Sequence, residues 1–465
     1  MSTMEEQLAT TPRTTAVAVV KRPPRKVKID EVDAIPVREV EVVSKEEERH
    51  QHQVQKKAKK PSASFISSAA MTDRQIIGAE VDSEVLFGFL SAAEKVVPSD
   101  KNSPILSSIK LSYEHNAERM FIESASTNIW TAVAIKATPR GDYGFEAMVP
   151  ARHARNAANA MRDSFKTLSV GMNEGRIWIG QHCIPGGGHP QDFPPRPLIR
   201  EWEARAVVPA FYFEEICARV LTASSKDPTK TGLHGVLLDF AVARDRSVSC
   251  TAVGSDGNRM HILELPQVKV QLRGHASPPS LMVGEQFFRY LRSVANREWT
   301  AVELSETQIC AKGEDYQAVS VATMKGATAT KGLENWQSVN VSYEGHWSVD
   351  RKELERAIRK IREATSDEAI DVRLDATREQ LDIWFYDKDT RKIRETISAR
   401  RFSGPAVVDV TIDLNLLLSA VVACRSGLIR LGFNIPNKQS TSPVTIRGED
   451  DQFKAIVMPL DRSSR

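Results

Sequence analysis

The chain has 465 residues, of which 41% are hydrophobic and 26% charged, and its formal net charge is +3 at pH 7. This length predicts about three domains with substantial cores. Residues 1–70 contain 13 Lys and Arg against 10 Asp and Glu, so the remaining residues carry equal numbers of each sign. A neutral body argues against a protein that coats nucleic acid over its whole surface, but it permits one basic face.

The five cysteines are scattered and form no C-x-x-C pair, a pattern typical of reduced thiols in the cytosol. No apolar stretch approaches the roughly 18 residues that a membrane-spanning helix needs. The first residues lack the basic and apolar regions of a secretion signal. The sequence therefore predicts a soluble, cytoplasmic protein.

Residues 1–73 differ in composition from the rest of the chain. They contain KRPPRKVK, KEEERHQHQVQ and KKAKK, few aromatic residues and no durable hydrophobic period. This composition predicts a disordered, charged arm. The arm is either a basic tether for DNA or a partner, or a solvated extension without a binding role.

Three domain-length repeats follow the arm. Each opens with a helix-period segment, at 82–97, 210–225 and 350–364, and continues with several short strand-like runs. A second helical segment then follows at 151–163, 284–296 and 413–424. The spacing suits a small domain rather than a solenoid repeat, and it predicts domains at 74–203, 204–338 and 339–465.

The runs between the helices alternate apolar and polar residues, as half-buried antiparallel strands do. Examples are SSIKLSY (107–113), WTAVAIKA (130–137), GVLLDF (235–240) and QLDIWFY (380–386). Two runs flank a turn at 173–175, and two more flank a turn near 305, so each pair predicts a hairpin. Each repeat is therefore expected to be α+β, with linkers at 185–197 and 325–336.

Catalytic signatures are missing from the chain. It contains no phosphate-binding loop and no supported Ser/His/Asp or Cys/His set. The glycines at 186–188 sit among prolines and predict a plain loop. His182, Cys183 and His189 lack metal-ligand spacing and a fourth partner, although a metal enzyme built on this loop stays a minor alternative. No metal, cofactor or enzymatic activity is expected.

Basic residues recur on the predicted helices of all three repeats. Arg152, Arg155 and Arg162 share a broad face of one helix, and Arg289 and Arg292 form an i, i+3 pair on its counterpart. The first helix of the last repeat carries Arg356, Arg359 and Lys360. A solvated face explains any single helix, but recurrence on a neutral body favours phosphate contact without base readout.

Several motifs resemble the sliding-clamp family, the beta subunit of bacterial DNA polymerase III, over residues 75–465. In chain order they are SPILSSIKL, MVPARHARNAANAM, PQDFP, LHGVLLDF, GSDGNRMHILELP and KAIVMPL. The resemblance implies three repeated clamp domains, with helices lining a ring of two head-to-tail chains and antiparallel sheets outside. It implies non-specific contact with encircled duplex DNA, and the candidate DNA-binding residues are Lys101, Arg152, Arg155, Arg162, Arg289, Arg292, Arg356, Arg359 and Lys360.

The resemblance also implies a pocket between domains 2 and 3 for short, partly apolar peptides. Its partners would be the replicative polymerase, the clamp loader and repair polymerases or ligase. The residues carried over are Leu233, Ser255, Gly257, Asn258, Arg259, Met260, Val339, Ile456, Met458, Pro459 and Leu460. Ser255, Asn258 and Met260 depart from the usual Thr, His and Leu, so the pocket is expected to prefer a different peptide.

The leading hypothesis is a processivity clamp that tethers the replicative polymerase to duplex DNA. The alternative is a clamp-fold paralogue that acts as a repair-specific or decoy partner-binding ring. The sequence leaves open the plasmid, phage or chromosomal origin of the protein, the role of residues 1–70 and the strength of the dimer.

Overall fold

The structure is a computed structural model, and all of its described residues lie in the segment Phe65–Arg465. It describes residues 77–98, 105–173, 175–198, 201–245, 247–273, 280–295, 299–324, 333, 336–339, 343, 345–364, 371–376, 379–386, 392–403, 408–433, 443–449 and 452–460. The predicted arm and Lys101 lie outside these residues. Within them, no helix is long and apolar enough to cross a membrane.

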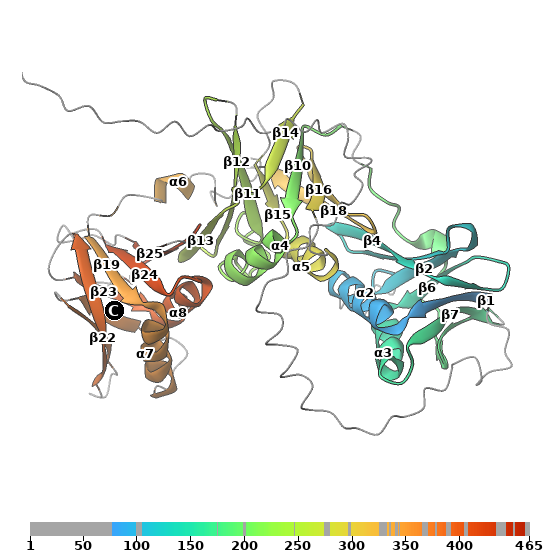
Figure 1. The fold of residues 1–465 in the computed structure, drawn as a ribbon, viewed down its shortest axis with the longest axis horizontal. Helices are drawn as coiled ribbons and strands as arrows, with labels where there is room; N and C mark the ends of the chain where they lie inside the picture. Colours follow the sequence, from blue (N-terminus) through green and yellow to red (C-terminus); the bar gives the residue numbers. More distant parts are fainter. Residues whose placement is uncertain are drawn as a thin grey trace, which may run out of the picture. The chain divides into compact units, whose positions relative to one another are not determined.

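The first repeat contains two helices and two antiparallel sheets (Figure 1). The helices are α2 (Ser83–Val96) and α3 (Ala151–Arg162). The strands are β1 (Ile77–Asp82), β2 (Ser108–Glu114), β3 (Arg119–Ala125), β4 (Ile129–Lys136), β5 (Thr138–Arg140), β6 (Phe145–Pro150), β7 (Thr167–Asn173), β8 (Arg176–Ile179) and β9 (His182–Ile184). Short 3-10 turns η3 (His115–Ala117) and η4 (Pro190–Asp192) complete it.

The second repeat has the same order of elements. Its helical segments are α4 (Phe211–Glu215), the π-helical turn η5 (Ile216–Val220) and α5 (Glu285–Val294). Its strands are β10 (Ala204–Pro209), β11 (Val236–Val242), β12 (Val248–Ser255), β13 (Arg259–Glu264), β14 (Lys269–Leu272), β15 (Leu281–Val283), β16 (Trp299–Leu304), β17 (Gln308–Lys312) and β18 (Tyr316–Met324).

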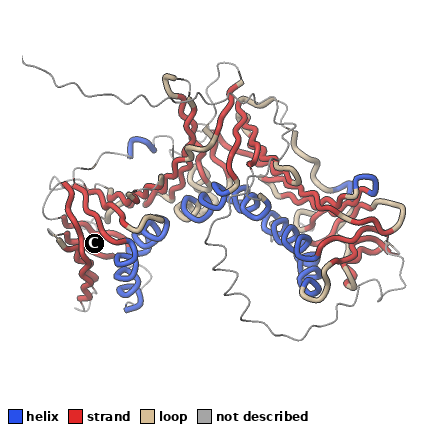
Figure 2. The backbone as a smooth tube through the Cα atoms, viewed as in Figure 1, coloured by secondary structure: helices blue, strands red, loops and turns tan. Residues whose placement is uncertain are grey.

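The third repeat follows the short helix α6 (Trp336–Val339). Its two long helices are α7 (Arg351–Ala364) and α8 (Leu414–Ala423). Its strands are β19 (Gly345–Asp350), β20 (Asp371–Ala376), β21 (Gln380–Tyr386), β22 (Lys392–Ser403), β23 (Val408–Asp413), β24 (Leu428–Phe433), β25 (Val444–Gly448) and β26 (Phe453–Val457). Within each repeat the two helical segments pack beside the strands (Figure 2).

Local sequence explains where the helices begin and which face they bury. The carboxylate of Asp82 accepts hydrogen bonds from the first backbone amides of α2, and Asp413 does the same for α8. Leu86, Leu90 and Ala93 are buried on one side of α2, as the helical period requires. These helix predictions and the α+β class are therefore confirmed.

One predicted helix ends early. The apolar period of 210–225 predicts a single α-helix, but the α-helix stops at Glu215 and widens into the π-turn η5. After this turn the backbone amide of Ser225 donates to the carbonyl oxygen of Leu233, a contact outside the helix. The bond to Leu233 requires the chain to leave the helix path before Ser225, and periodicity alone does not reveal such a tertiary contact.

Two strand pairings join the repeats. Strand β18 pairs antiparallel with β4, and β26 pairs antiparallel with β13. In both cases the last strand of one repeat adds to the corresponding strand of the repeat before it. Buried side chains of the second and third repeats form one continuous cluster, which also takes in Ala92, Val96 and Ile129 of the first repeat, while most of the first repeat's core forms a second cluster. The exact domain limits stay predictions.

Candidate functional site

The basic residues predicted on α3 differ in their surroundings. Arg152 is exposed, whereas the guanidinium of Arg155 lies 3.0 Å from the carboxylate of Glu94 on α2. Arg162 lies over the ring of Phe87 at 4.3 Å and also contacts Asp163. Each guanidinium remains at least partly open to solvent. Arg155 and Arg162 are therefore held in place by α2, while Arg152 projects freely.

The basic pair on α5 is likewise matched by carboxylates. Arg289 lies 3.1 Å from Glu285, and Arg292 lies 3.4 Å from Glu214 on α4. Burial favours the neutral form of Glu285, but Lys226 and Arg289 outweigh this effect and lower the pKa of its carboxyl group. Exposed ion pairs of this kind are each worth at most about 1 kcal/mol. Phosphate oxygens could therefore replace these carboxylates at little cost.

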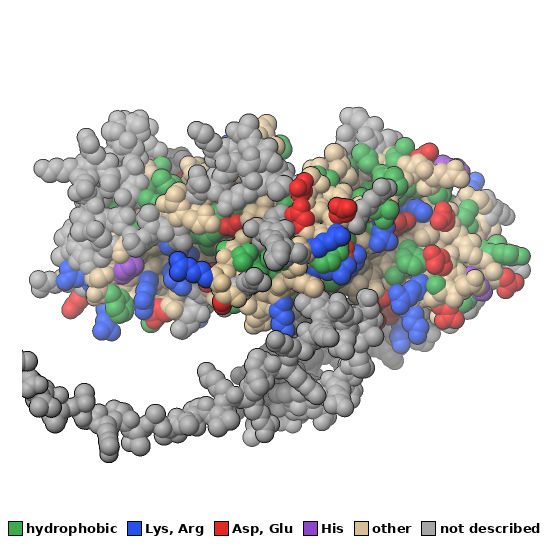
Figure 3. All heavy atoms as spheres, turned by 90° about the horizontal axis from the view of Figure 1, so that it is seen from above, with side chains coloured by type: hydrophobic (Ala, Val, Ile, Leu, Met, Phe, Trp, Pro, Cys, Tyr) green, Lys and Arg blue, Asp and Glu red, His purple; other side chains and the backbone are tan. Residues whose placement is uncertain are grey.

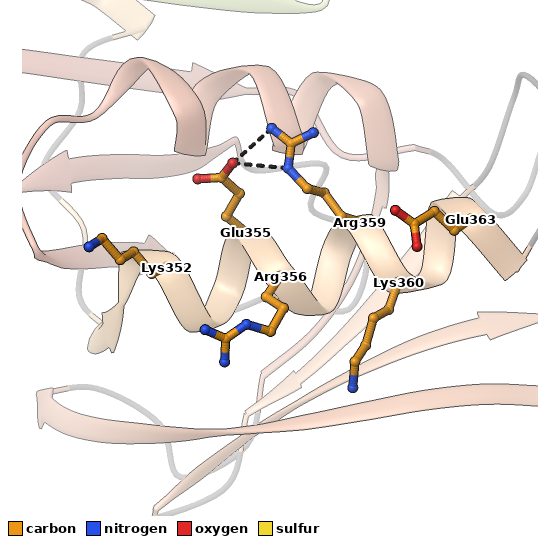
Figure 4. Close-up of a pocket in the computed structure, with 6 residues that line it drawn as sticks. All are labelled: Lys352, Glu355, Arg356, Arg359, Lys360 and Glu363. Atoms are coloured by element: carbon orange, nitrogen blue, oxygen red, sulfur yellow. Dashed lines mark hydrogen bonds and ion pairs between the residues drawn. The ribbon is translucent and has the colours of Figure 1, made fainter. Parts of the chain in front are cut away.

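Helix α7 carries the densest group of cations (Figure 4). Arg356 and Lys360 point to the same side of the helix, whereas Arg359 turns back to Glu355 with its nitrogens 2.7 and 2.9 Å from one oxygen. Lys360 also reaches Glu395 at 3.1 Å. These residues line a shallow surface depression together with Lys352 and Glu363. Sequence reasoning missed Lys352, one turn before Arg356.

An apolar cluster brings together part of the predicted peptide pocket. Met260 of β13 lies directly opposite Ile456 of β26, and the partly buried side chains of Leu233 and Val339 pack against the same cluster. We call this set the pocket cluster. Its remaining members, which sequence reasoning missed, are Leu237, Val253, Ile262, Met282, Leu333 and Trp336.

The last described residues run past this cluster. The backbone amide of Met458 donates to the carbonyl oxygen of Asn258 at 2.8 Å, and that of Leu460 donates to Thr411 at 2.9 Å. The side chains of Met458, Pro459 and Leu460 are only partly buried. They therefore present apolar surface beside the pocket cluster without being members of it.

The turn between β12 and β13 is fixed by its own hydrogen bonds. Ser255 Oγ accepts from the amide of Gly257 at 3.1 Å and donates to the carbonyl oxygen of Arg259 at 2.6 Å. Gly257 has a φ of 98°, a conformation that glycine adopts without strain. Asp256 accepts from the amides of Asn258 and Arg259. This predicted part of the site is thus a rigid turn.

The guanidinium of Arg259, one of the predicted pocket residues, is held by other groups of the protein. In the structure it contacts the carboxylate of Asp256, the carbonyl oxygen of Thr222 at 2.7 Å and the hydroxyl of Ser419 on α8. Arg259 therefore ties the turn to the third repeat, and its contact with a peptide stays a prediction.

Trp336 explains why the segment before the third repeat lies against the pocket cluster. Its indole Nε1 donates to Asp239 Oδ2 at 2.7 Å, and Gln337 donates to the same oxygen at 2.9 Å. A buried carboxylate with several donors is a strong anchor. A tryptophan in the otherwise polar segment KGLENW was the available sequence signal for this anchor.

The structure assigns no chemical role to the remaining candidates, which lie in the segment 182–189. His182 and Cys183 are exposed on β9, and His189 Nδ1 accepts from the amide of Gln191. The described residues contain no group of three or more His, Cys, Asp or Glu side chains suited to a metal. Gly187 packs where a Cβ atom would meet Ser108, so this loop is built for close backbone packing.

The order of elements and the two strand junctions can now be compared with known structures. The clamp of Bartonella birtlesii, solved with griselimycin bound, matches at a TM-score of 0.68 and 17% identity. The alignment covers 83% of this chain and 99% of that one. The fold is that of a bacterial sliding clamp. The Caulobacter crescentus clamp matches at 0.69 and 16% identity over 83% and 99% of the chains.

The clamp fold also matches the DNA polymerase III beta subunit of Thermotoga maritima. The TM-score is 0.68 at 15% identity, and the match covers 82% of this chain and 99% of that chain. No family model matches the chain. A search of curated proteins likewise gives no match. The resemblance therefore lies in the fold, at low sequence identity.

Proposed function

We propose that this protein is a sliding clamp that encircles duplex DNA and tethers a replicative polymerase for processive synthesis. The observation that carries the proposal is the clamp fold, whose two strand junctions are built in the same way. The proposal assigns the chain a topological and binding role and no catalytic chemistry.

The way in which strands join neighbouring repeats also predicts how two copies of the chain would close into a ring. Among the described residues, β9 pairs only with β8, and residues 392–398 of β22 pair only with β21. By its place in the repeat, β9 corresponds to β18 and β26, the last strands of the other two repeats. Residues 392–398 of β22 correspond to β4 and β13, the strands with which β18 and β26 pair. A head-to-tail pairing of β9 with β22 of a second copy would repeat the joint and close a homodimer.

The basic helices support the proposed contact with DNA. Arg152, Arg289 and Arg356 are exposed, and the carboxylate that pairs with Arg289, Glu285, lies in an exposed ion pair of low energy. Such groups bind phosphates without reading bases, and a closed ring needs little affinity because topology prevents escape. The DNA-binding role of these residues, and of Lys101, is part of the proposal.

The pocket cluster supports partner recruitment through short peptides. Its methionines, Met260 and Met282, adapt to different apolar side chains, and Met458 and Leu460 extend the apolar surface. The partners of this proposal are the polymerase, the clamp loader and repair proteins that carry such peptides.

Retention on circular DNA tests the proposal directly. The purified protein would be loaded onto nicked circular DNA with a clamp loader and separated from free protein by gel filtration. We expect co-elution with the circle and release after the circle is linearised, because an encircling protein slides off the ends. Equal retention on both forms would contradict encirclement. Light scattering should give about twice the chain mass of 51.7 kDa.

A further inference from the structure

The strands of the third repeat carry a row of cations on their outward face, separate from the cations of the helices. Arg400 of β22 and Arg430 of β24 both lie opposite Ser348 of the strand between them, β19. Arg430 lies opposite Arg447 of β25, and Arg447 lies opposite Lys454 of β26. Directly opposed residues point to the same face of a sheet. We call Arg400, Arg430, Arg447 and Lys454 the cationic row.

This row is electrostatically unbalanced. Like charges directly opposite each other on neighbouring strands repel. Arg430 forms an ion pair with Glu449 at 3.3 Å, but among the described residues none is seen for Arg400 or Arg447. Burial lowers the pKa of Lys454, and the nearby charge of Arg447 lowers it further. An anionic ligand would relieve this repulsion.

Aromatic rings hold several of these cations in place. The guanidinium carbons of Arg400 and Arg430 lie 5.3 and 5.1 Å from the centre of the Phe402 ring, which is half-exposed. Lys454 Nζ lies 5.4 Å from the ring centre of Tyr343. Contacts of this kind restrict long side chains and so reduce the entropy lost when a ligand binds. Arg400, Arg430 and Lys454 are therefore pre-organised.

The row begins where the pocket cluster ends. Lys454 lies opposite Ile262 across the β13–β26 junction, and Ile262 belongs to the pocket cluster. In Figure 3, the coloured part of the third repeat shows Lys and Arg side chains with hydrophobic and acidic side chains among them. From Ile262 on β13 to Arg400 on β22 the sheet crosses five strand spacings, roughly 24 Å. An extended peptide of about seven residues spans that distance.

We infer that the cationic row binds an acidic segment of a partner peptide whose apolar residues occupy the pocket cluster. The inference rests on the proposed recruitment function and adds a charge requirement to it. The backbones of Arg430, Arg447 and Lys454 lie about 5 Å apart on adjacent strands, and Arg400 lies about 10 Å from Arg430 because β19 runs between them. Acidic side chains of a flexible segment can meet these spacings. Continuity with the apolar pocket fits one peptide that carries both elements.

Single-stranded nucleic acid is the other polyanion to consider. Surfaces that bind it stack successive bases on several exposed aromatic rings. Of the two aromatic rings that contact this row, Phe402 is half-exposed and Tyr343 is almost fully buried. A single exposed ring offers little surface for base stacking, so this surface favours an acidic peptide over single-stranded nucleic acid.

The test uses four labelled peptides and the full-length protein. Each peptide contains Leu-Ala-Leu-Phe as its apolar part and carries a Gly-Ser spacer followed by four Glu or four Gln, at either its N-terminal or its C-terminal end. Fluorescence anisotropy would measure binding at low and high salt. We expect one glutamate peptide to bind roughly three to thirty times more tightly than its glutamine match. The gain should shrink at high salt, where charges are screened.

Two variants of the protein test whether the cationic row causes the tighter binding of the glutamate peptide. The triple variant Arg400→Gln, Arg430→Gln and Arg447→Gln should bind both peptides of a pair equally, because only the charge gain is lost. A matched variant, Lys136→Gln, Lys166→Gln and Arg176→Gln, removes the same charge from exposed positions in the first repeat and should keep the gain. Thermal melting of the row variant should be unchanged or improved, since repulsion within the row is reduced.

Each other result overturns the inference in a distinct way. Equal binding of both peptides of each pair would remove the charge requirement and leave the proposed pocket standing. A gain that survives in the row variant would place the acidic site elsewhere. Failure of all four peptides to bind would contradict both the pocket and the row. If oligothymidylate displaces the labelled glutamate peptide at a lower concentration than the unlabelled peptide does, the row binds nucleic acid instead.

Discussion

Buried Arg219 donates a hydrogen bond from Nε to the carbonyl oxygen of Ala423, 2.7 Å away, and thereby joins the second repeat to the third. The same guanidinium lies 3.0 Å from Glu215 and 4.4 Å from the ring centre of Phe453. Glu215 in turn pairs with Arg425 at 2.6 Å. The junction therefore has a polar anchor beside its strand pairing.

Replacing Arg219 by Ala should destabilise the protein by about 2–4 kcal/mol. The substitution leaves the carbonyl oxygen of Ala423 without this donor and Glu215 with one cation fewer in a buried site. Arg425→Ala removes an exposed cation from the same carboxylate and should cost less than about 1 kcal/mol. Urea unfolding measures both, and equal losses would show that Arg219 has no special role.

The stability of the junction should depend on pH through His261. Complete burial lowers the pKa of this imidazole to about 4, with Arg259 and Arg219 also opposing its charge and Asp256 favouring it. The unfolded state therefore binds a proton more readily between pH 6.5 and 4, and stability falls as pH decreases through that window. His261→Asn should show a smaller loss over the same range in urea unfolding at stepped pH. Identical pH profiles would refute the assignment.

Neutralising the exposed helix cations should weaken DNA retention without changing its sequence dependence. The variant Arg152→Gln, Arg289→Gln and Arg356→Gln removes one phosphate contact from each repeat. Each lost contact should reduce the slope of log affinity against log salt by about 0.9. The variant at Lys136, Lys166 and Arg176 serves as the charge-matched control. A dependence on base sequence in either protein would contradict backbone-only contact.

Truncating the apolar edge of the pocket should weaken peptide binding strongly. Met458→Ala and Leu460→Ala together remove two partly buried side chains beside the pocket cluster, each worth about 1.5–3 kcal/mol when a ligand covers it. Binding of the apolar peptides should weaken at least tenfold, while the dimer mass stays the same. The control Tyr143→Ala changes a side chain that is 71% exposed in the first repeat. Unchanged affinity in the double variant would place the pocket elsewhere.

Deleting residues 1–70 should leave the melting transition and the dimer intact. Their composition offers too little apolar surface to form a core. Calorimetry of the shortened chain measures the first expectation, and light scattering measures the second. Loss of cooperative melting would make the arm structural, and a selective loss of DNA retention would support a tether.

The sequence predicts regular elements better than it predicts tertiary contacts. Helices α3 and α8 match their predicted ranges closely, because buried residues at helical spacing lie between clear end signals such as Asp413. The π-turn η5 that follows Glu215, and the contact of Ser225 with Leu233 after it, are not indicated by the apolar period. Periodicity describes one segment at a time and does not contain such contacts.

The site shows the same limit. Met260 and Ile456 could be paired only through the family resemblance, since nothing in their local sequence indicates a shared ladder. Arg400, Arg430 and Arg447 each sit among alternating apolar residues, as on any half-exposed strand. Their alignment depends on strand register, which the sequence leaves unspecified across loops of varied length.

Each joint between repeats contains a ladder of backbone amides and carbonyls, at β4–β18 and at β13–β26. Every residue except proline supplies the same donor and acceptor, so a ladder places few demands on which side chains occupy it. Substitutions can therefore accumulate along these strands while the repeats remain attached. An architecture fastened in this way tolerates wide differences in sequence, and the clamp fold of this chain is shared at 17% identity.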